Sequence, residues 1–226
     1  MSHTIDHPRV STPRLTRPQA VALVAAPAVA VLARLLTTPW YQGDANKPDN
    51  SRVLTEVADS VGRNQAGAAL AVLSAALFVA AAVVVGGIVR AGSPRVGWTG
   101  LVLAGFGAFG LAVFSAFVGV ITIMAAHDDR EAMLELMTQL NDSAVAEVSY
   151  LVLALGAVGW LVLGYGLYRS GSIPRAAAVV GAIGAAGVML TTPGPAIVFI
   201  AGSAVFCLLG FAWVAFAARG KERAAV

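Results

Sequence analysis

The chain has 226 residues, of which 58% are hydrophobic and only 12% charged, and its net charge is +3. Soluble domains carry about 25% charged residues, so this composition excludes an ordinary water-soluble domain. The basic residues form no stripe interleaved with aromatic residues, and we therefore expect no nucleic-acid partner.

The chain starts with a polar segment, residues 1–18, in which Pro8, Pro13 and Pro18 stand among Ser and Thr. This composition is typical of a disordered tail. Long apolar runs follow, and a helix needs about 20 mainly apolar residues to cross a bilayer. The runs lie at about 19–37, 66–89, 97–124, 147–168, 175–192 and 196–218, before a second tail at 219–226. We predict an all-α, polytopic transmembrane helical bundle with six spans in the membrane domain 19–218.

One alternative concerns the first run. It follows basic residues and contains Ala-Val-Ala at 28–30, a sequence that a signal peptidase can cleave. Cleavage would leave five spans, whereas apolar residues that continue to Leu36 and the following Trp40 and Tyr41 favour an uncleaved span.

Both loops that face away from the tails contain a short amphipathic stretch. In the first, a helix with Asn50 or Ser51 as its N-cap is expected to run into the second span, with Val53, Leu54, Val57 and Val61 on its apolar face. In the second, Asp128 and Asp129 can cap a helix whose apolar stripe is Met133, Met137 and Leu140. The two helices form either a lid over the bundle or interfacial helices packed on lipid or on one another.

The distribution of Lys and Arg predicts the orientation. Ten basic residues fall in the tails and in the loops on the same side: Arg9, Arg14, Arg17, Arg90, Arg95, Arg169, Arg175, Arg219, Lys221 and Arg223. The other loops hold four basic residues and ten of the twelve acidic residues. Because basic loops stay in the cytoplasm, both termini are predicted to be cytoplasmic.

The Gly-x-Gly-x-x-Gly pattern at 105–110 lies inside the third apolar run, where no strand can precede it, so we interpret it as helix packing instead of dinucleotide binding. A strip of small residues at every fourth position supports this interpretation: Gly100, Ala104, Ala108, Ala112 and Ala116.

Two ionisable residues lie near the outer ends of predicted spans, Arg34 in the first and Glu147 in the fourth. If these spans are neighbours, Arg34 and Glu147 can pair and, with Trp40 and Tyr41, line an outer vestibule; otherwise each side chain reaches the interface separately. No catalytic motif and no carboxylate or histidine at mid-membrane depth is present. We therefore expect no enzyme activity, cofactor or metal.

The segment 161–190 contains the loop between the fourth and fifth spans. Tyr165 and Tyr168 are expected at the lipid headgroups, with Arg169 and Arg175 holding the loop in the cytoplasm. Gly171 permits the turn, and Pro174 suits the first turn of the fifth span. The phrase Gly-Tyr, Leu-Tyr-Arg-Ser-Gly, Pro-Arg resembles a family of bacterial integral membrane proteins described as a domain of unknown function. The residues that carry the resemblance are Gly164, Tyr165, Leu167, Tyr168, Arg169, Ser170, Gly171, Pro174 and Arg175.

This resemblance implies a multi-pass protein of the bacterial cytoplasmic (inner) membrane and no particular activity. We expect a non-enzymatic accessory or interaction component, with the lipid bilayer and other membrane proteins or a second copy as its partners. The alternative is a carrier or binding protein for an apolar or cationic small molecule that enters through the outer vestibule.

Overall fold

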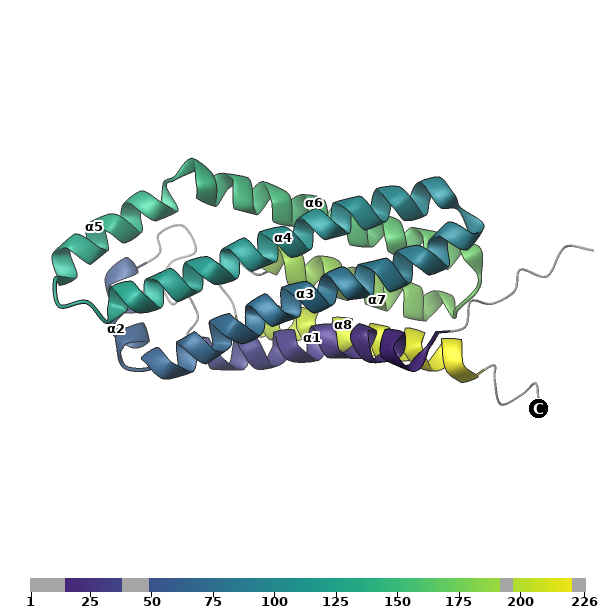
Figure 1. The fold of residues 1–226 in the computed structure, drawn as a ribbon, viewed down its shortest axis with the longest axis horizontal. Helices are drawn as coiled ribbons and strands as arrows, with labels where there is room; N and C mark the ends of the chain where they lie inside the picture. The colour runs from purple at the N-terminus through teal and green to yellow at the C-terminus, as the bar shows by residue number, and fades with distance from the viewer. Residues whose placement is uncertain (1–14, 38–48, 192–196, 221–226) are drawn as a thin grey trace, which may run out of the picture.

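The computed structural model describes residues 15–37, 49–191 and 197–220, which form helices and no strand (Figure 1). The helices are, in chain order, α1 (Arg17–Leu36), α2 (Asn50–Ala58), α3 (Val61–Gly92), α4 (Pro94–Ala125), α5 (Arg130–Asn141), α6 (Ala144–Ser170), α7 (Arg175–Thr191) and α8 (Ile197–Gly220). Trp40, Tyr41, the connection between α7 and α8, and most of both predicted tails lie outside the described residues.

Six of these helices coincide with the six apolar runs. Four of them, α1, α3, α4 and α6, are long and apolar enough to cross a membrane, whereas α7 is a shorter apolar helix of 17 residues and α8 has 24. The chain is therefore an all-helical membrane protein. The second run begins five residues earlier than predicted, at Val61, because its first turn is polar and a hydropathy pattern does not register polar turns of a helix.

The six long helices form a closed ring in which neighbours in sequence are neighbours in space. α1 packs against α3, α3 against α4, α4 against α6, α6 against α7 and α7 against α8, and α8 returns to α1 (Figure 1). A single residue, Ser93, joins α3 to α4, so these two helices run antiparallel. The α2 and α5 helices lie together at one end of the ring.

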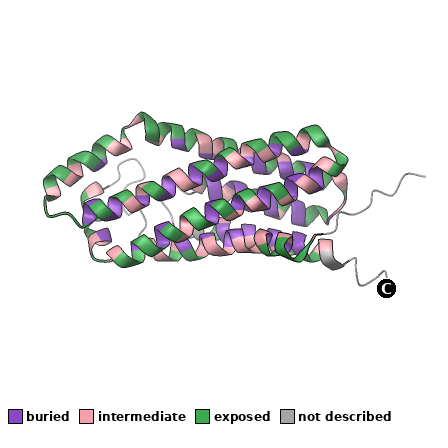
Figure 2. Ribbon diagram, in the orientation of Figure 1, coloured by how far each residue is buried: buried purple, intermediate pink, exposed green. Residues whose placement is uncertain are grey.

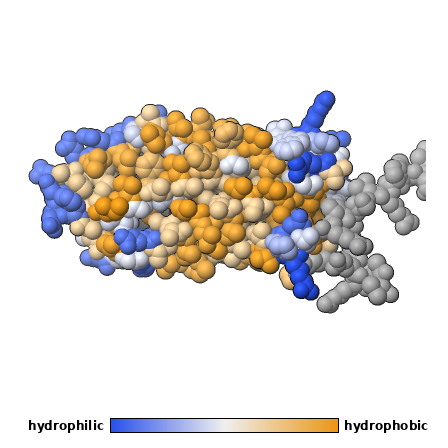
Figure 3. Space-filling model, in the orientation of Figure 1, coloured by the Kyte–Doolittle hydropathy of each residue, from blue (hydrophilic) through white to orange (hydrophobic). Residues whose placement is uncertain are grey.

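Aromatic side chains fill the centre of the ring. Trp160 of α6 lies 6.0 Å from Phe78 of α3 and 5.2 Å from Phe211 of α8, measured between ring centroids, and all three are buried. Large apolar side chains such as Phe109 and Phe216 point outward instead, with exposed fractions of 65% and 75%. Figure 2 shows the buried stripes inside the ring, and Figure 3 shows a broad apolar belt across the face in view. A belt of this kind suits a hydrocarbon surrounding.

Small residues bring α4 and α6 into backbone contact, as the sequence predicts. Gly100 faces Leu163, Ala104 faces Gly159, and Gly107 of the Gly-x-Gly-x-x-Gly pattern faces Gly156. The predicted strip is correct as far as Ala108 and wrong beyond it, because Ala112 is half-buried and Ala116 is exposed. Steps of four residues overshoot a helical turn by about 40°, so a strip with that spacing drifts off the contact face.

Candidate functional site

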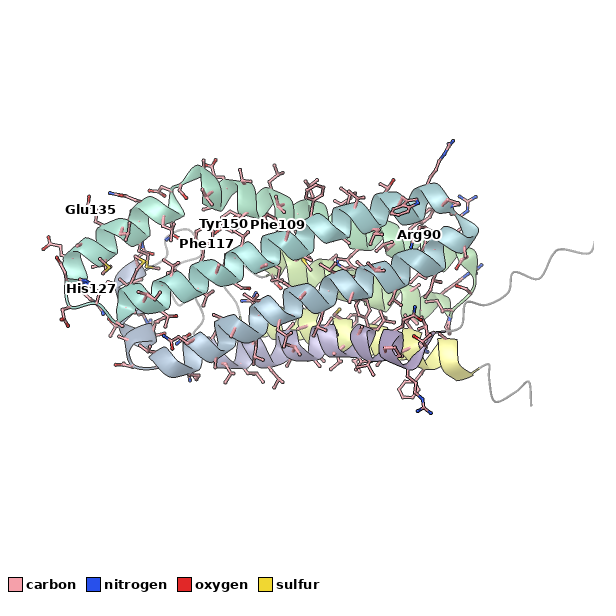
Figure 4. The ribbon with its side chains drawn as sticks, viewed as in Figure 1. Arg90, Phe109, Phe117, His127, Glu135 and Tyr150 are labelled. Carbon is pink, nitrogen blue, oxygen red and sulfur yellow. The ribbon has the colours of Figure 1, made fainter. Side chains whose placement is uncertain are left out.

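The two ends of the bundle carry opposite charges. Where α3 ends and α4 begins, the described residues include five arginines and no carboxylate: Arg17, Arg90, Arg95, Arg169 and Arg175. We call this the basic end. The opposite, acidic end carries nine carboxylates: Asp49, Glu56, Asp59, Asp128, Asp129, Glu131, Glu135, Asp142 and Glu147. Figure 4 shows Arg90 at one end and His127 and Glu135 at the other.

At the acidic end, two helices extend far beyond the length of a span. The α3 and α4 helices have 32 residues each. A helix of this length measures about 48 Å, which exceeds a hydrocarbon core of about 30 Å. Arg90 and Arg95 lie on either side of the α3–α4 turn at the basic end. The excess length therefore lies at the acidic end, where α2 and α5 pack.

There α2, α5 and the last turns of α4 form a second apolar core, which we call the cap. The cluster joins three helices: Val53, Leu54 and Val57 of α2, Ile121, Met124 and Ala125 of α4, and Met137 of α5. The two amphipathic helices therefore pack on one another and on the end of α4, and the choice between a lid over the bundle and interfacial helices stays a prediction.

Side-chain caps start both cap helices. The Asp129 carboxylate accepts a hydrogen bond from the backbone N–H of Ala132, as the sequence predicts for α5. For α2 the cap is Asp49, which accepts from the N–H of Arg52 at 3.1 Å, and not the expected Asn50 or Ser51. The helix is interrupted at Asp59 and Ser60, so Val61 belongs to α3 and not to the apolar face of α2. This break lets α2 fold back onto α4.

Three polar links join α2 to the α5 segment. Asn50 Nδ2 donates to Thr138 Oγ1 at 3.2 Å, and Asn141 Nδ2 donates to Asn50 Oδ1 at 3.3 Å. At the other end of the pair, the Arg130 guanidinium donates to the Thr55 hydroxyl. These partners lie 75 to 91 residues apart in sequence, so a local sequence pattern cannot predict the pairs.

The structure does not bring Arg34 and Glu147 together. Arg34 lies in the last turn of α1, which packs against α3 and α8, and Glu147 lies exposed in the first turn of α6, which packs mainly against α4 and α7. No ion pair joins them in the described part of the chain. Because Trp40 and Tyr41 lie outside that part, the vestibule that combined the four residues stays a prediction.

A small cleft lies beside the cap, between α4 and the joint of α5 and α6. Its lining includes Phe114, Phe117, Asn141 and Tyr150, of which Figure 4 labels Phe117 and Tyr150. Its volume is about 10 Å³, room for about one water molecule. A small-molecule site usually measures at least about 300 Å³, so this cleft does not suit one.

The predicted loop at the basic end has the expected geometry at most positions. Gly171 ends α6 in the left-handed region, with φ 61°, and Arg175 lies over the Tyr168 ring with its guanidinium carbon 5.2 Å from the centroid. Tyr165, Tyr168 and Arg169 are exposed. Pro174 directly precedes α7, one residue before the predicted position in its first turn. Its carbonyl accepts the hydrogen bond of the Ala178 N–H, as the residue before a helix does.

Four buried hydroxyl side chains inside the bundle donate to backbone carbonyls. Ser115, Thr122 and Ser149 each donate to the carbonyl four residues earlier, and Ser74 of α3 donates to the Ala26 carbonyl of α1 at 3.2 Å. Among the described residues, no three His, Cys, Asp or Glu side chains come together as metal ligands.

Comparison with known proteins places the chain in a family. The family model for a domain of unknown function, DUF4386, matches residues 20–218. No curated protein matches the chain, and no solved structure does. The matched region covers all six long helices almost completely, together with both cap helices. The chain therefore belongs to the DUF4386 family.

Proposed function

We propose that this protein is a six-span, non-enzymatic component of the bacterial inner membrane, and that it binds a partner protein through its cap on the outer side. The main support is the contrast between a filled bundle and a cap that extends beyond the membrane. A carrier needs a cavity near mid-membrane, and there Phe78, Trp160 and Phe211 fill the centre. The cap, by contrast, presents polar helices to water.

The charge distribution supports the orientation. Five arginines and no carboxylate lie at the described basic end, which the positive-inside rule assigns to the cytoplasm. The α7 helix has 17 residues, about 26 Å, which suits a thin or locally thinned bilayer. Both termini then lie in the cytoplasm and the cap lies outside.

The chemistry of the cap indicates the kind of partner. On α5, Glu131 and Glu135 are exposed, and Asp128 and Asp129 precede the helix. Complementary charge steers association and selects partners, so a protein with a basic surface fits this face. The partner surface would contact the exposed face of α5, because α5 packs its Met137 side inward.

Site-specific labelling tests the orientation. In a chain with Cys207→Ala, a single cysteine at Glu135 should react in intact cells with a maleimide that does not cross membranes. A single cysteine at Ser172 should react only after the cells are opened. The reverse pattern would contradict the proposed topology.

Photo-crosslinking in native membranes tests the partner. A photoreactive residue in place of the exposed Leu136 should form protein adducts, whereas one in place of Phe109, in the apolar belt, should react with lipid. Charge reversal by Glu131→Lys and Glu135→Lys should reduce the Leu136 adducts severalfold, and so should high salt. Adducts that survive both treatments, or none at position 136, would refute the proposal.

A further inference from the structure

A groove opens at the basic end, where the α3–α4 turn meets the end of α6. Its volume is about 370 Å³. The polar part of its lining consists of Ser93, Arg169, Ser170 and Ser172, and the apolar part includes Ile88, Val89, Val96 and Tyr165. The polar residues lie at helix ends and in the loop, whereas Ile88 and Val89 are buried one turn further into the bundle. The groove is therefore amphipathic along the bundle axis.

Arg169 is the arginine available to a ligand in this groove. Arg90 lies over the Trp98 ring at 4.4 Å and donates to the Gly86 carbonyl, and Arg175 lies over Tyr168. The Arg169 side chain is exposed and has no hydrogen bond, ion pair or ring contact within the described residues. Since that end of the described chain carries no carboxylate, an anion meets only attraction there.

Hydroxyl groups surround the same position. The Ser170 and Ser172 oxygens lie 2.8 Å apart, and the Ser172 N–H donates to the Ser170 hydroxyl. Ser93, at the start of α4, makes no capping hydrogen bond with its side chain. The Ser170 hydroxyl donates its proton to the Leu167 carbonyl at 2.8 Å, so the hydroxyls that can rotate to donate to an oxyanion are those of Ser172 and Ser93. A guanidinium beside two such hydroxyls is a donor set that suits phosphate.

We propose that this groove binds an anionic phospholipid. Arg169 and the serine hydroxyls hold the phosphate, and the start of an acyl chain lies against Val96 and Tyr165. The mixed lining favours a lipid over a free phosphate, because a small soluble anion would leave the apolar part of the groove unoccupied. Basic pockets between membrane helices are known to hold such headgroups. The groove lies at the opposite end from the cap, so the proposed lipid binding is independent of the function proposed for the cap.

Lipid titration of the purified, delipidated full chain tests this proposal. Phosphatidylglycerol should raise the unfolding temperature and stay bound in native mass spectra, and phosphatidylcholine with the same acyl chains should do neither. Arg169→Gln should weaken phosphatidylglycerol binding about fivefold or more, the contribution expected of one basic residue beside an anionic lipid. Ala91→Phe, which narrows the groove without changing its charge, should weaken binding to a similar degree.

The matched control is Arg17→Gln. Arg17 is exposed at the same end on α1, outside the groove lining, so its loss should change binding by less than about twofold through screened charge alone. The unfolding temperature of each lipid-free variant shows whether it is folded. Unchanged binding in folded Arg169→Gln and Ala91→Phe, or equal effects of Arg17→Gln and Arg169→Gln, would overturn the proposal. Equal stabilisation by glycerol phosphate without acyl chains would also overturn it, in favour of a soluble ligand.

Discussion

The bundle and the cap are both packed helices, but different contacts hold them together. In the bundle, backbones touch: Gly107 meets Gly156, and Gly184 meets the Cys207 backbone, so a Cβ at these glycines would lie closer than 3.0 Å to backbone atoms. In the cap, larger side chains such as Leu54 and Met137 interlock, and both are buried. Hydrogen bonds between α2 and α5 add to this contact.

The surrounding solvent explains the difference. Lipid is as apolar as a leucine side chain, so burying leucine between membrane helices gains little and close backbone contact supplies the attraction. In the proposed topology the cap stands in water, where each buried side chain of this size contributes about 1.5–3 kcal/mol. The chain therefore packs its helices in two ways, by close backbone contact in the bundle and by buried side chains in the cap. Single substitutions can test each kind of packing separately.

Among the substitutions that test helix contacts, the largest effect is expected for Gly107→Ala. The new Cβ would clash with the Gly156 backbone, which can move only if α4 and α6 separate, at a cost of about 3 kcal/mol or more. Gly105→Ala is the matched control, since no atom lies within 4 Å of its added Cβ. There, alanine should stabilise the helix by up to about 1 kcal/mol. Unfolding of both variants in lipid nanodiscs checks the opposite signs, and equal stabilities would show that the glycine contact does not hold the bundle.

Met137→Ala tests the contribution of buried side chains to the stability of the cap. Removing this fully buried side chain should cost about 2–4 kcal/mol of local stability. The neighbouring Leu136 is 46% exposed, and Leu136→Ala should change stability by less than about 0.5 kcal/mol. Hydrogen exchange should rise in α2 and α5 and stay unchanged in α6 and α7. A rise throughout the bundle would mean that the cap and the ring unfold as one unit.

The sequence predicts local features well and distant pairings poorly. Apolar runs locate the six long helices, and Met137 falls on the predicted apolar stripe. Asp129 and Gly171 mark helix ends through local effects, a capping carboxylate in the first case and a positive φ that glycine adopts without strain in the second. The placement of Arg34 and Glu147 depends on which helices are neighbours, and hydropathy carries no such information. The groove at Arg169 likewise needs three segments brought together by the ring.

A smaller effect is expected for Asn50→Ala, which removes the links of α2 to Thr138 and Asn141. Because both bonds are partly exposed to water, their joint loss should cost about 1 kcal/mol of cap stability. Ser51→Ala changes an exposed neighbour as the control. Faster hydrogen exchange in α2 and α5 of Asn50→Ala alone checks the expectation. If the two variants exchange equally, apolar burial alone orients the cap helices.

The smallest change is expected for Trp160→Phe, at a buried polar group without a hydrogen-bond partner in the described part of the chain. Trp160 is 1% exposed, and its indole N–H has no acceptor among the described residues. Trp160→Phe removes this unpaired donor, which offsets the loss of ring volume, so stability should stay within about 1 kcal/mol of the parent. Trp160→Ala leaves a cavity beside Phe78 and Phe211 and should cost about 3–5 kcal/mol. Unfolding in nanodiscs separates the two variants. A loss in Trp160→Phe as large as in Trp160→Ala would mean that the indole N–H has an acceptor in the membrane, and that the ring is held there by a polar contact as well as by packing.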